Sequence, residues 1–289
     1  MTFEKKLQIF RENLREINIR EDLTKRQKAL TALEIAKECC DANAEADEIR
    51  KLLGELNESL SPKEELLFLS EILCSKKGAN LKGLLFIGST DPTPAGAHSK
   101  ISYVKNRYND EAFEHFSHST PNVKPDYASS FKEAAENVFD GRCEFCILPI
   151  MNSEEGRLMS FYSLLDRYEL KICETVDLDT DDSSRTIRYA RVGKACKEQK
   201  ERFQRNQSYI FEFSITAASS DFLVPLFEAA KQSKATLVSI DSLPVEYTTD
   251  TQRFFFSFSI PQKSSAAFRL FVALKHQGYM PIGLYGENK

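Results

Sequence analysis

The sequence predicts a multidomain protein of the α + α/β class with three consecutive modules. Residues 1–80 carry apolar residues at helical spacing almost without interruption, which predicts an all-helical module. Residues 81–195 alternate short apolar runs with helical patterns, which is typical of an α/β lobe. Residues 207–289 follow the order strand, helix, strand, strand, helix, strand, which predicts a ferredoxin-like βαββαβ module.

The bulk composition favours an ordinary globular protein. Of 289 residues, 42% are hydrophobic and 28% are charged, and the net charge of -4 gives no electrostatic case for a nucleic-acid partner. No apolar run approaches the roughly 20 residues that cross a bilayer, and the first residues lack the apolar core of a signal peptide. We therefore expect a cytoplasmic protein without a membrane partner. The seven cysteines have no disulfide-scaffold spacing, so we expect reduced thiols.

Three helices are expected in the first module. Apolar spacing predicts one long helix over residues 3–41 and a second over residues 43–57. A Ser-Pro-Lys-Glu sequence from Ser61 predicts the start of a third helix, which Gly78 ends. Three helices this amphipathic favour a partner chain that covers them, and we expect a homodimer.

The α/β lobe is organised around residues 143–156, where an apolar strand runs into a polar turn and then a helix. Helix N-termini beyond the carboxyl ends of strands offer free amide donors, so this arrangement is where α/β domains bind anions. In chain order we expect a strand over 84–87, a Gly/Pro-rich loop over 88–97, a helix capped by Ser99 that continues through Val104, a helix over 131–139, a strand over 145–150, the turn 152–156, a helix over 158–168, a strand over 170–178, an acidic connection over 179–185 and a strand over 186–192.

Cys143 and Cys146 form a Cys-x-x-Cys pair at the start of the apolar strand. A zinc site needs a second Cys or His pair at suitable spacing, which is not found, and redox pairs favour a helix start. We expect packing cysteines and no metal site.

The turn resembles that of prephenate dehydratase, an enzyme of phenylalanine biosynthesis. The family carries a Pro-x-Glu-Asn-Ser-x-x-Gly turn, and this chain has Pro149, Asn152, Ser153 and Gly156 in register, with Met151 at the glutamate position. The resemblance implies substrate-binding roles for Asn152 and Ser153. The alternative is an ordinary strand-turn-helix segment without a binding role.

The strand expected over 186–192 resembles the family strand that carries a catalytic Thr-Arg-Phe. Arg188 and Tyr189 match its last two residues, whereas Ile187 takes the threonine position and Thr186 stands one residue away. A one-residue shift in a strand points a side chain to the other face. The resemblance implies catalytic candidates in Thr186 and Arg188, and a substrate-binding role for Arg188.

A larger departure lies between the last two strands of the lobe. In the family an entire second α/β lobe separates them and forms one wall of the active-site cleft, whereas here the short connection 179–185 joins them. Dehydration of prephenate needs a general acid for the departing hydroxyl and a site closed to water. We expect an impaired dehydratase step. The retained residues Asn152, Ser153 and Arg188 either still bind an anion or are remnants of an ancestral enzyme without a present role.

The helical module resembles a chorismate mutase of the all-helical type, in which two chains interlock. Arg26 and Lys37 lie eleven positions apart, as an arginine and a lysine do in that family, and Glu48 stands where its second helix places an acid. The rearrangement needs a dicarboxylate held in a reactive conformer and donors on the ether oxygen, which implies catalytic roles for these three residues. Arg11 and Arg15 do not keep the spacing of the family's earlier arginine. The alternative is a solvated helix face.

The last module resembles an ACT domain, the amino-acid-sensing module that follows prephenate dehydratase. The segment 241–244 stands where the family has Glu-Ser-Arg-Pro, and the segment 221–223 stands where it has Gly-Ala-Leu. In the family these segments bind phenylalanine across a dimer interface. The resemblance implies effector-binding roles for Asp221, Phe222, Leu223, Asp241, Ser242 and Pro244. Because the family's glycine and arginine are replaced, a module that only dimerises is the alternative.

The three modules together resemble the bifunctional chorismate mutase/prephenate dehydratase. This resemblance implies a small-molecule ligand of the aromatic pathway, namely chorismate, prephenate or phenylalanine, and no cofactor. The alternative function is a non-catalytic regulator that senses phenylalanine or a related aromatic metabolite.

Overall fold

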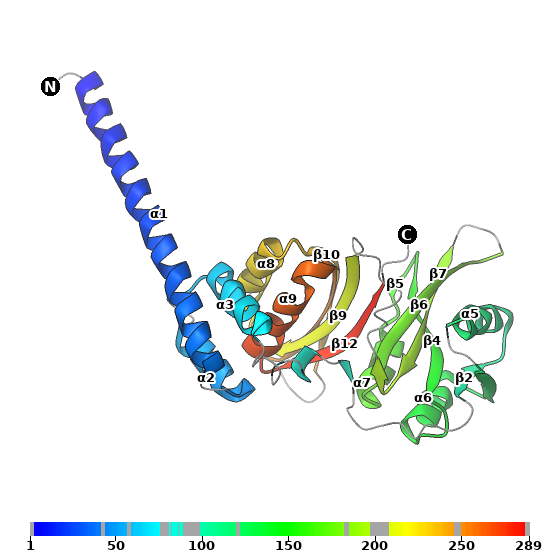
Figure 1. The fold of residues 1–289 in the computed structure, drawn as a ribbon. Coiled ribbons are helices and arrows are strands. Elements are labelled where there is room, and N and C mark those ends of the chain that lie inside the picture. Colours follow the sequence, from blue (N-terminus) through cyan, green and yellow to red (C-terminus); the bar gives the residue numbers. More distant parts are fainter. Residues whose placement is uncertain are drawn as a thin grey trace. The chain divides into compact units, whose positions relative to one another are not determined.

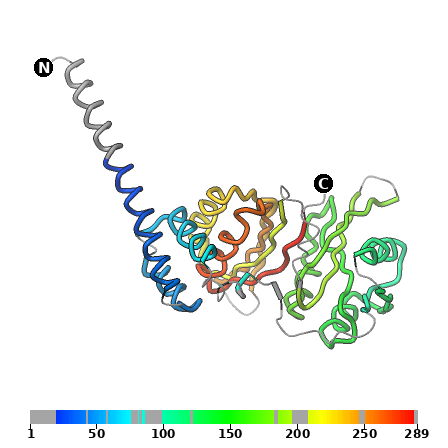
Figure 2. Tube along the Cα trace, viewed as in Figure 1, coloured from blue at the N-terminus to red at the C-terminus, as the bar shows by residue number. Residues whose placement is uncertain are grey.

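The chain divides into two compact units in the computed structural model (Figures 1 and 2), and each is described by itself. The first contains residues 1–83, 222–232 and 266–275, and the second contains residues 84–221, 233–265 and 276–289. The structure describes all residues except 1–2, 42–43, 57–58, 76–80, 82, 86, 89–98, 120–121, 182–184, 197–207, 246–249 and 287–289, and it describes no side chains for residues 3–19, 83, 87–88 and 196.

Helices build the first unit. Their bounds are α1 (Phe3–Asp41), α2 (Ala46–Leu56), α3 (Pro62–Cys74), α8 (Leu223–Gln232) and the part of α9 (Gln262–Lys275) that begins at Ala266. The long helix and the two shorter ones predicted from apolar spacing are therefore confirmed. Figure 1 draws α1 as one unbroken helix, and α3 packs against both α1 and α8.

The start of α3 follows from its first four residues. The Glu64 carboxylate accepts hydrogen bonds from the backbone amide of Ser61, at 2.9 Å, and from the Ser61 hydroxyl. This reciprocal arrangement satisfies an amide that the helix itself leaves without a partner. The predicted end at Gly78 lies outside the described residues, and α3 ends at Cys74 with Ser75 as its C-cap.

A buried ion pair lies in the helical unit. The Nζ of Lys275, the last residue of α9, is 2.6 Å from Oε1 of Glu65 in the first turn of α3. Their side chains are 11% and 2% exposed. Burial raises the pKa of the Glu65 carboxyl above its ordinary value, although Lys275 acts in the opposite direction. The pair joins two helices that are more than 200 residues apart in the sequence.

A ten-stranded mixed sheet forms the second unit, in the order β10-β11-β9-β12-β6-β7-β4-β2-β3, with β5 paired to β4. The bounds are β2 (Lys100–Val104), β3 (Lys124–Ala128), β4 (Phe145–Asn152), β5 (Gly156–Arg157), β6 (Lys171–Asp179), β7 (Thr186–Gly193), β9 (Ser208–Ala217), β10 (Thr236–Pro244), β11 (Gln252–Pro261) and β12 (Tyr279–Gly286). The short strands β1 (Ile87–Gly88) and β8 (Ala195–Cys196) pair with each other.

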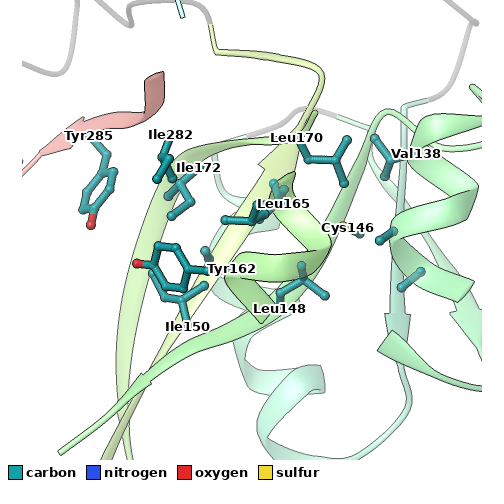
Figure 3. Close-up of a cluster of buried hydrophobic side chains, with 14 of the residues drawn as sticks. Val138, Cys146, Leu148, Ile150, Tyr162, Leu165, Leu170, Ile172, Ile282 and Tyr285 are labelled. Carbon is teal, nitrogen blue, oxygen red and sulfur yellow. The ribbon is translucent and has the colours of Figure 1, made fainter. Parts of the chain in front are cut away.

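Helices cover both faces of the sheet in the region of β2, β4, β6 and β7. Residues of α6 (Phe131–Phe139) and α7 (Met159–Arg167) share one apolar core with the strands, and this core includes Leu148, Tyr162 and Leu165 (Figure 3). Residues of α5 (Arg107–Ser117) pack on the opposite face with a second core. This is the layered arrangement of an α/β domain, as predicted.

Several predictions about the lobe are corrected or extended. Residues 84–87 do not form a four-residue strand: residues 83–85 form a 3₁₀ turn, and β1 begins at Ile87. Ser99 does not cap a helix, because residues 100–104 form β2 and its hydroxyl donates to the Glu144 carboxylate. Neither α5 nor β3 was predicted. The Gly/Pro-rich loop lies largely outside the described residues.

The C-terminal elements follow the predicted order β9, α8, β10, β11, α9, β12. Their four strands pair antiparallel, and β12 also meets β6 in parallel at Gly283 and Ile172. At this seam a Cβ added to Gly283 would lie 2.9 Å from the Cβ of Ile172, so the close approach requires glycine. The two groups of strands therefore form one continuous sheet.

The cysteines differ in part from the expectation of reduced thiols. Cys173 is disulfide-bonded, whereas Cys143 and Cys146 are free and buried. Burial raises the pKa of the Cys143 thiol to about 11, and burial also raises that of Cys146. Neutral, buried thiols suit the predicted packing role. Among the residues that the structure describes, no group of His, Cys, Asp and Glu is arranged to hold a metal ion.

None of the described helices combines the length and the apolar character that crossing a membrane requires.

Candidate functional site

The turn after β4 holds Asn152 and Ser153 in local hydrogen bonds. The Oδ1 of Asn152 accepts from the amide of Glu154 at 3.0 Å, which closes an Asx turn. Gly156 ends the turn with a φ of 75°, in the left-handed region that favours glycine. The turn then pairs back onto β4 through β5, where Asn152 lies opposite Gly156.

Two hydrogen bonds join Ser153 to Thr186 at the start of β7. The amide of Ser153 donates to the carbonyl of Thr186 at 2.9 Å, and the amide of Thr186 donates to the Ser153 hydroxyl oxygen at 3.0 Å. The Thr186 hydroxyl in turn donates to Oδ1 of Asp179 at 2.9 Å. Both predicted side chains are therefore engaged within the protein.

The strand register separates the predicted site residues by face. Asn152 lies opposite Ile187, and Met151 lies opposite Arg188. Ile187 packs with the core on the α5 face, whereas Arg188 alternates with it and points to the face of α6 and α7. Asn152 and Arg188 are thus close in the ladder but on opposite faces of the sheet.

Arg188 forms a two-pronged ion pair with Asp177 on β6. Its Nε donates to Oδ1 at 2.6 Å and a terminal nitrogen donates to Oδ2 at 2.8 Å. The hydrogen bonds to Asp177 raise the pKa of Arg188 above its ordinary value, so the guanidinium keeps its charge. This fork is the geometry with which arginine binds a ligand carboxylate. Asp177 occupies it.

A short connection joins β6 and β7 as an antiparallel hairpin. Only residues 180–185 lie between the two strands, and of these the structure describes Thr180, Asp181 and Arg185. Arg107 at the start of α5 forms an ion pair with Asp181. Six residues therefore separate the two strands.

Arg157, directly after the turn, is the centre of a buried polar network. Its side chain is 2% exposed and donates from one terminal nitrogen to Oδ2 of Asp241 at 2.7 Å. The other terminal nitrogen donates to the hydroxyls of Ser239 at 2.9 Å and Ser257 at 2.6 Å. The guanidinium also lies 4.9 Å from the centre of the Tyr162 ring. Arg157 thus ties the turn to β10 and β11.

The network continues through Glu212, a buried carboxylate on β9. Its two oxygens accept from the hydroxyls of Tyr162 at 2.7 Å and Tyr285 at 2.6 Å. Burial is the largest cause that raises the pKa of both tyrosines well above the ordinary value, so both hydroxyls stay protonated and donate. Glu212 and Tyr285 also act electrostatically on Arg188. The network therefore extends from Asp241 to the neighbourhood of Arg188.

The predicted effector-binding residues lie in two segments. In β10, Asp241 pairs with Arg157, Ser242 lies opposite Phe254, and Pro244 is the last residue, opposite Gln252. In the other segment, Asp221 is exposed, Phe222 follows it in a turn, and Leu223 begins α8. The carboxylate at the position of the family's glutamate is thus already paired.

The predicted mutase residues lie on two helices, α1 and α2. Arg26 and Lys37 are exposed on α1, and eleven positions correspond to about 16.5 Å along a helix. Glu48 accepts the amide of Glu45 at 2.8 Å and so caps the start of α2. The candidates for an earlier arginine, Arg11 and Arg15, lie on α1 but their side chains are outside the described residues.

The sequence did not predict Asp177, Arg157 or Glu212. A carboxylate opposite an arginine on neighbouring strands requires the register of the pairing, which the sequence alone does not supply. Alternation along 171–179 could have placed Asp177 and Asp179 on one face. The partners of Arg157 lie 82 to 100 residues away, and no local pattern points to them.

Residues 104–182 match the family model described as prephenate dehydratase. This segment contains α5, α6, the turn and α7, and the chain thus carries a prephenate dehydratase-like segment. No curated protein is similar enough in sequence to be matched.

Solved structures of prephenate dehydratases share the fold. The enzyme from Streptococcus mutans superposes with a TM-score of 0.53 at 16% identity, over 66% of this chain and all of that one. The enzyme from Arthrobacter aurescens, in complex with L-Phe, gives 0.52 at 10% identity, over 65% of this chain and 90% of that one. A protein described as GqqA, a novel type of quorum quenching acylase, gives 0.51 at 15% identity, over 65% and 95%. Since proteins described as having different activities share this fold, the activity here depends on the site.

Proposed function

We propose that the chain is a prephenate dehydratase-like protein of phenylalanine biosynthesis in which the dehydratase step is impaired. The matched segment and the shared fold support the family relation. The Arg188–Asp177 fork is the observation that carries the loss of the step, because the one arginine of the family strand is already bound to a carboxylate. Ile187 at the threonine position faces the α5 core and offers no hydroxyl for proton transfer.

The first expected result is that the full chain does not convert prephenate to phenylpyruvate. Formation of phenylpyruvate should stay at the uncatalysed rate, because Ile187 offers no hydroxyl at the threonine position and Arg188 is already paired with Asp177. An active prephenate dehydratase assayed in parallel is the positive control. A kcat of about 1 per second or more, which is typical of enzymes, would contradict the proposal.

The chorismate mutase step belongs to the same proposal, with modules at residues 1–80, 81–195 and 207–289. Arg26, Lys37 and Glu48 would act there together with side chains from a second chain, as in the interlocked chains of the family that these helices resemble. The prephenate assay extends to this step by supplying chorismate instead. Activity that is lost in Arg26→Ala and Lys37→Ala but kept in Lys28→Ala, an exposed control on the same helix, supports it.

The alternative function is that of a non-catalytic regulator that senses phenylalanine or a related aromatic metabolite. The Arg157 network favours it, because the predicted effector residue Asp241 is tied directly to the turn of the dehydratase-like lobe. The retained βαββαβ order supports an ACT-like module.

We further propose that the chain forms a homodimer. Within the described residues β10 is an edge strand that pairs only with β11. It exposes Leu237, Val238 and Ile240, and an unpaired apolar edge is a surface on which a second strand can add. Exposed leucines at positions 23 and 30 of α1 support a second contact between chains.

Ligand sensing and dimer formation are tested together. We expect light scattering to give the mass of two chains, and L-phenylalanine to raise the melting temperature, with a stabilisation of about 2.7 kcal/mol at 100 times Kd. D-phenylalanine is the matched control and should have a smaller effect. A melting temperature that is equal in both ligands would contradict sensing, and a monomer mass would contradict the dimer.

A further inference from the structure

The β6–β7 hairpin supplies its own carboxylates to the two polar side chains that the family strand contributes. Asp177 lies opposite Arg188 and Asp179 lies opposite Thr186. The first pair forms the two-pronged contact at 2.6 and 2.8 Å, and the second forms a hydrogen bond of 2.9 Å. Each aspartate therefore stands where the carboxylate of a ligand would accept hydrogen bonds from the same donors.

We propose that Asp177 is a built-in occupant of a carboxylate-binding site whose fork is Arg188, and that it sets the affinity of this site for small aromatic carboxylates. The aromatic part of this ligand class rests on the proposed function. The carboxylate part rests on the geometry of the fork alone.

The pair is accessible enough for exchange with a ligand. The side chains of Arg188 and Asp177 are 26% and 32% exposed, so a small molecule can reach them from solvent. They are also shielded enough for charge-assisted hydrogen bonds to be stronger than at a fully exposed surface. A tethered carboxylate competes at an effective concentration of about millimolar or more, which keeps a free carboxylate out.

The surroundings of Arg188 suit an aromatic acid once Asp177 is removed. Met151 lies directly opposite Arg188 on β4, and sulfur makes favourable contacts with aromatic rings. Tyr285 and the buried Glu212 act electrostatically on the guanidinium. With Glu212 nearby, Asp177 is a second negative charge that repels an anion. Its removal therefore frees the fork and lowers this repulsion.

The competing explanation is an ordinary cross-strand ion pair that only supports the hairpin. Opposite-charge pairs of this kind contribute modestly to sheets. Under this explanation, truncation of Asp177 weakens the fold and creates no affinity for carboxylates. The two explanations differ in a binding measurement.

The decisive experiment titrates 3-phenylpropionate into the full chain by calorimetry. In Asp177→Ala we expect the affinity to rise on the order of tenfold or more over the unmodified chain, because the tethered competitor is gone. The affinity for the neutral amide of the same compound, 3-phenylpropionamide, should not rise. Asp177→Asn keeps the shape of the side chain and replaces Asp177→Ala if that variant folds poorly. Its affinity for 3-phenylpropionate should also rise.

Two further variants isolate the fork. Asp179→Ala removes the same charge from the same strand face but leaves the Arg188 pair intact, and its affinity should match that of the unmodified chain. The double variant Asp177→Ala/Arg188→Gln should lose the gain. Absence of a gain in both Asp177 variants with native circular dichroism, or an equal gain in Asp179→Ala, would overturn the inference. The prephenate assay uses the unmodified chain, so either proposal can fail without the other.

Discussion

Replacing Arg157 by alanine is expected to destabilise the chain by about 3 kcal/mol, since it removes a buried guanidinium that donates hydrogen bonds to several groups at once. The side chain is 2% exposed and makes hydrogen bonds to three side chains and to the carbonyl of Phe255. Its loss leaves the Ser257 hydroxyl without this donor and opens a cavity beside the Tyr162 ring. Asp241 is 39% exposed, so water relieves part of the cost.

Urea denaturation followed by circular dichroism measures this effect, because the chain has no tryptophan to report by fluorescence. Arg142→Ala is the matched control: its pair with Asp140 is exposed, with side chains 60% and 49% exposed, and should contribute little to stability. Arg157→Lys keeps the positive charge but not the forked hydrogen-bond donors, so its stability should fall between those of Arg157→Ala and Arg142→Ala. An Arg157→Ala variant as stable as Arg142→Ala would show that the network does not hold β10 and β11 to the turn.

The network also gives the two functional proposals a common physical basis. Asp241 belongs to the segment that resembles an effector-binding site, and Arg188 belongs to the strand that resembles a catalytic one. Between them lie Arg157, Glu212 and the two tyrosines that donate to it. Coupling between sites requires an element with two arrangements, and the Arg188 guanidinium has two possible partners in Asp177 and a ligand.

The predictable parts of the fold are those whose signal is local. The bounds predicted for α1 and α6 agree with the structure, since apolar spacing and caps act within a few turns. The helix α5 was missed although Ala112 and Phe116 lie four residues apart on its buried face. Residues 100–104 were assigned to a helix because Ser99 resembled a cap, whereas the alternation of Ile101 and Tyr103 favours a strand.

The candidate site was only partly predictable for a related reason. Residue types identified Asn152, Ser153 and Arg188, but their faces depend on the register of β4 with β7 and on a bulge between Pro149 and Met151. A bulge shifts every following side chain by one position, and no sequence pattern fixes where it falls. The identity of the group that occupies Arg188 depends on the same register. The sequence therefore identified candidate residues, but not the groups that they contact.

The second large effect is expected in the helical unit, where Glu65→Ala should cost about 3 kcal/mol because it removes the carboxylate that the buried ammonium of Lys275 contacts at 2.6 Å. The two charged groups are 2.6 Å apart and their side chains are 2% and 11% exposed, so water compensates little for the loss of one partner.

Because burial raises the pKa of Glu65, ionising this carboxyl on folding already costs free energy, and Lys275 offsets only part of that cost. Replacing both partners by apolar residues of similar size, in Glu65→Leu/Lys275→Met, should therefore recover most of the loss. Lys25→Ala, which removes an exposed pair with Glu21 on α1, is the control and should change stability little. If the double variant is as unstable as Glu65→Ala, the cost comes from lost packing between α3 and α9 and not from the stranded charge.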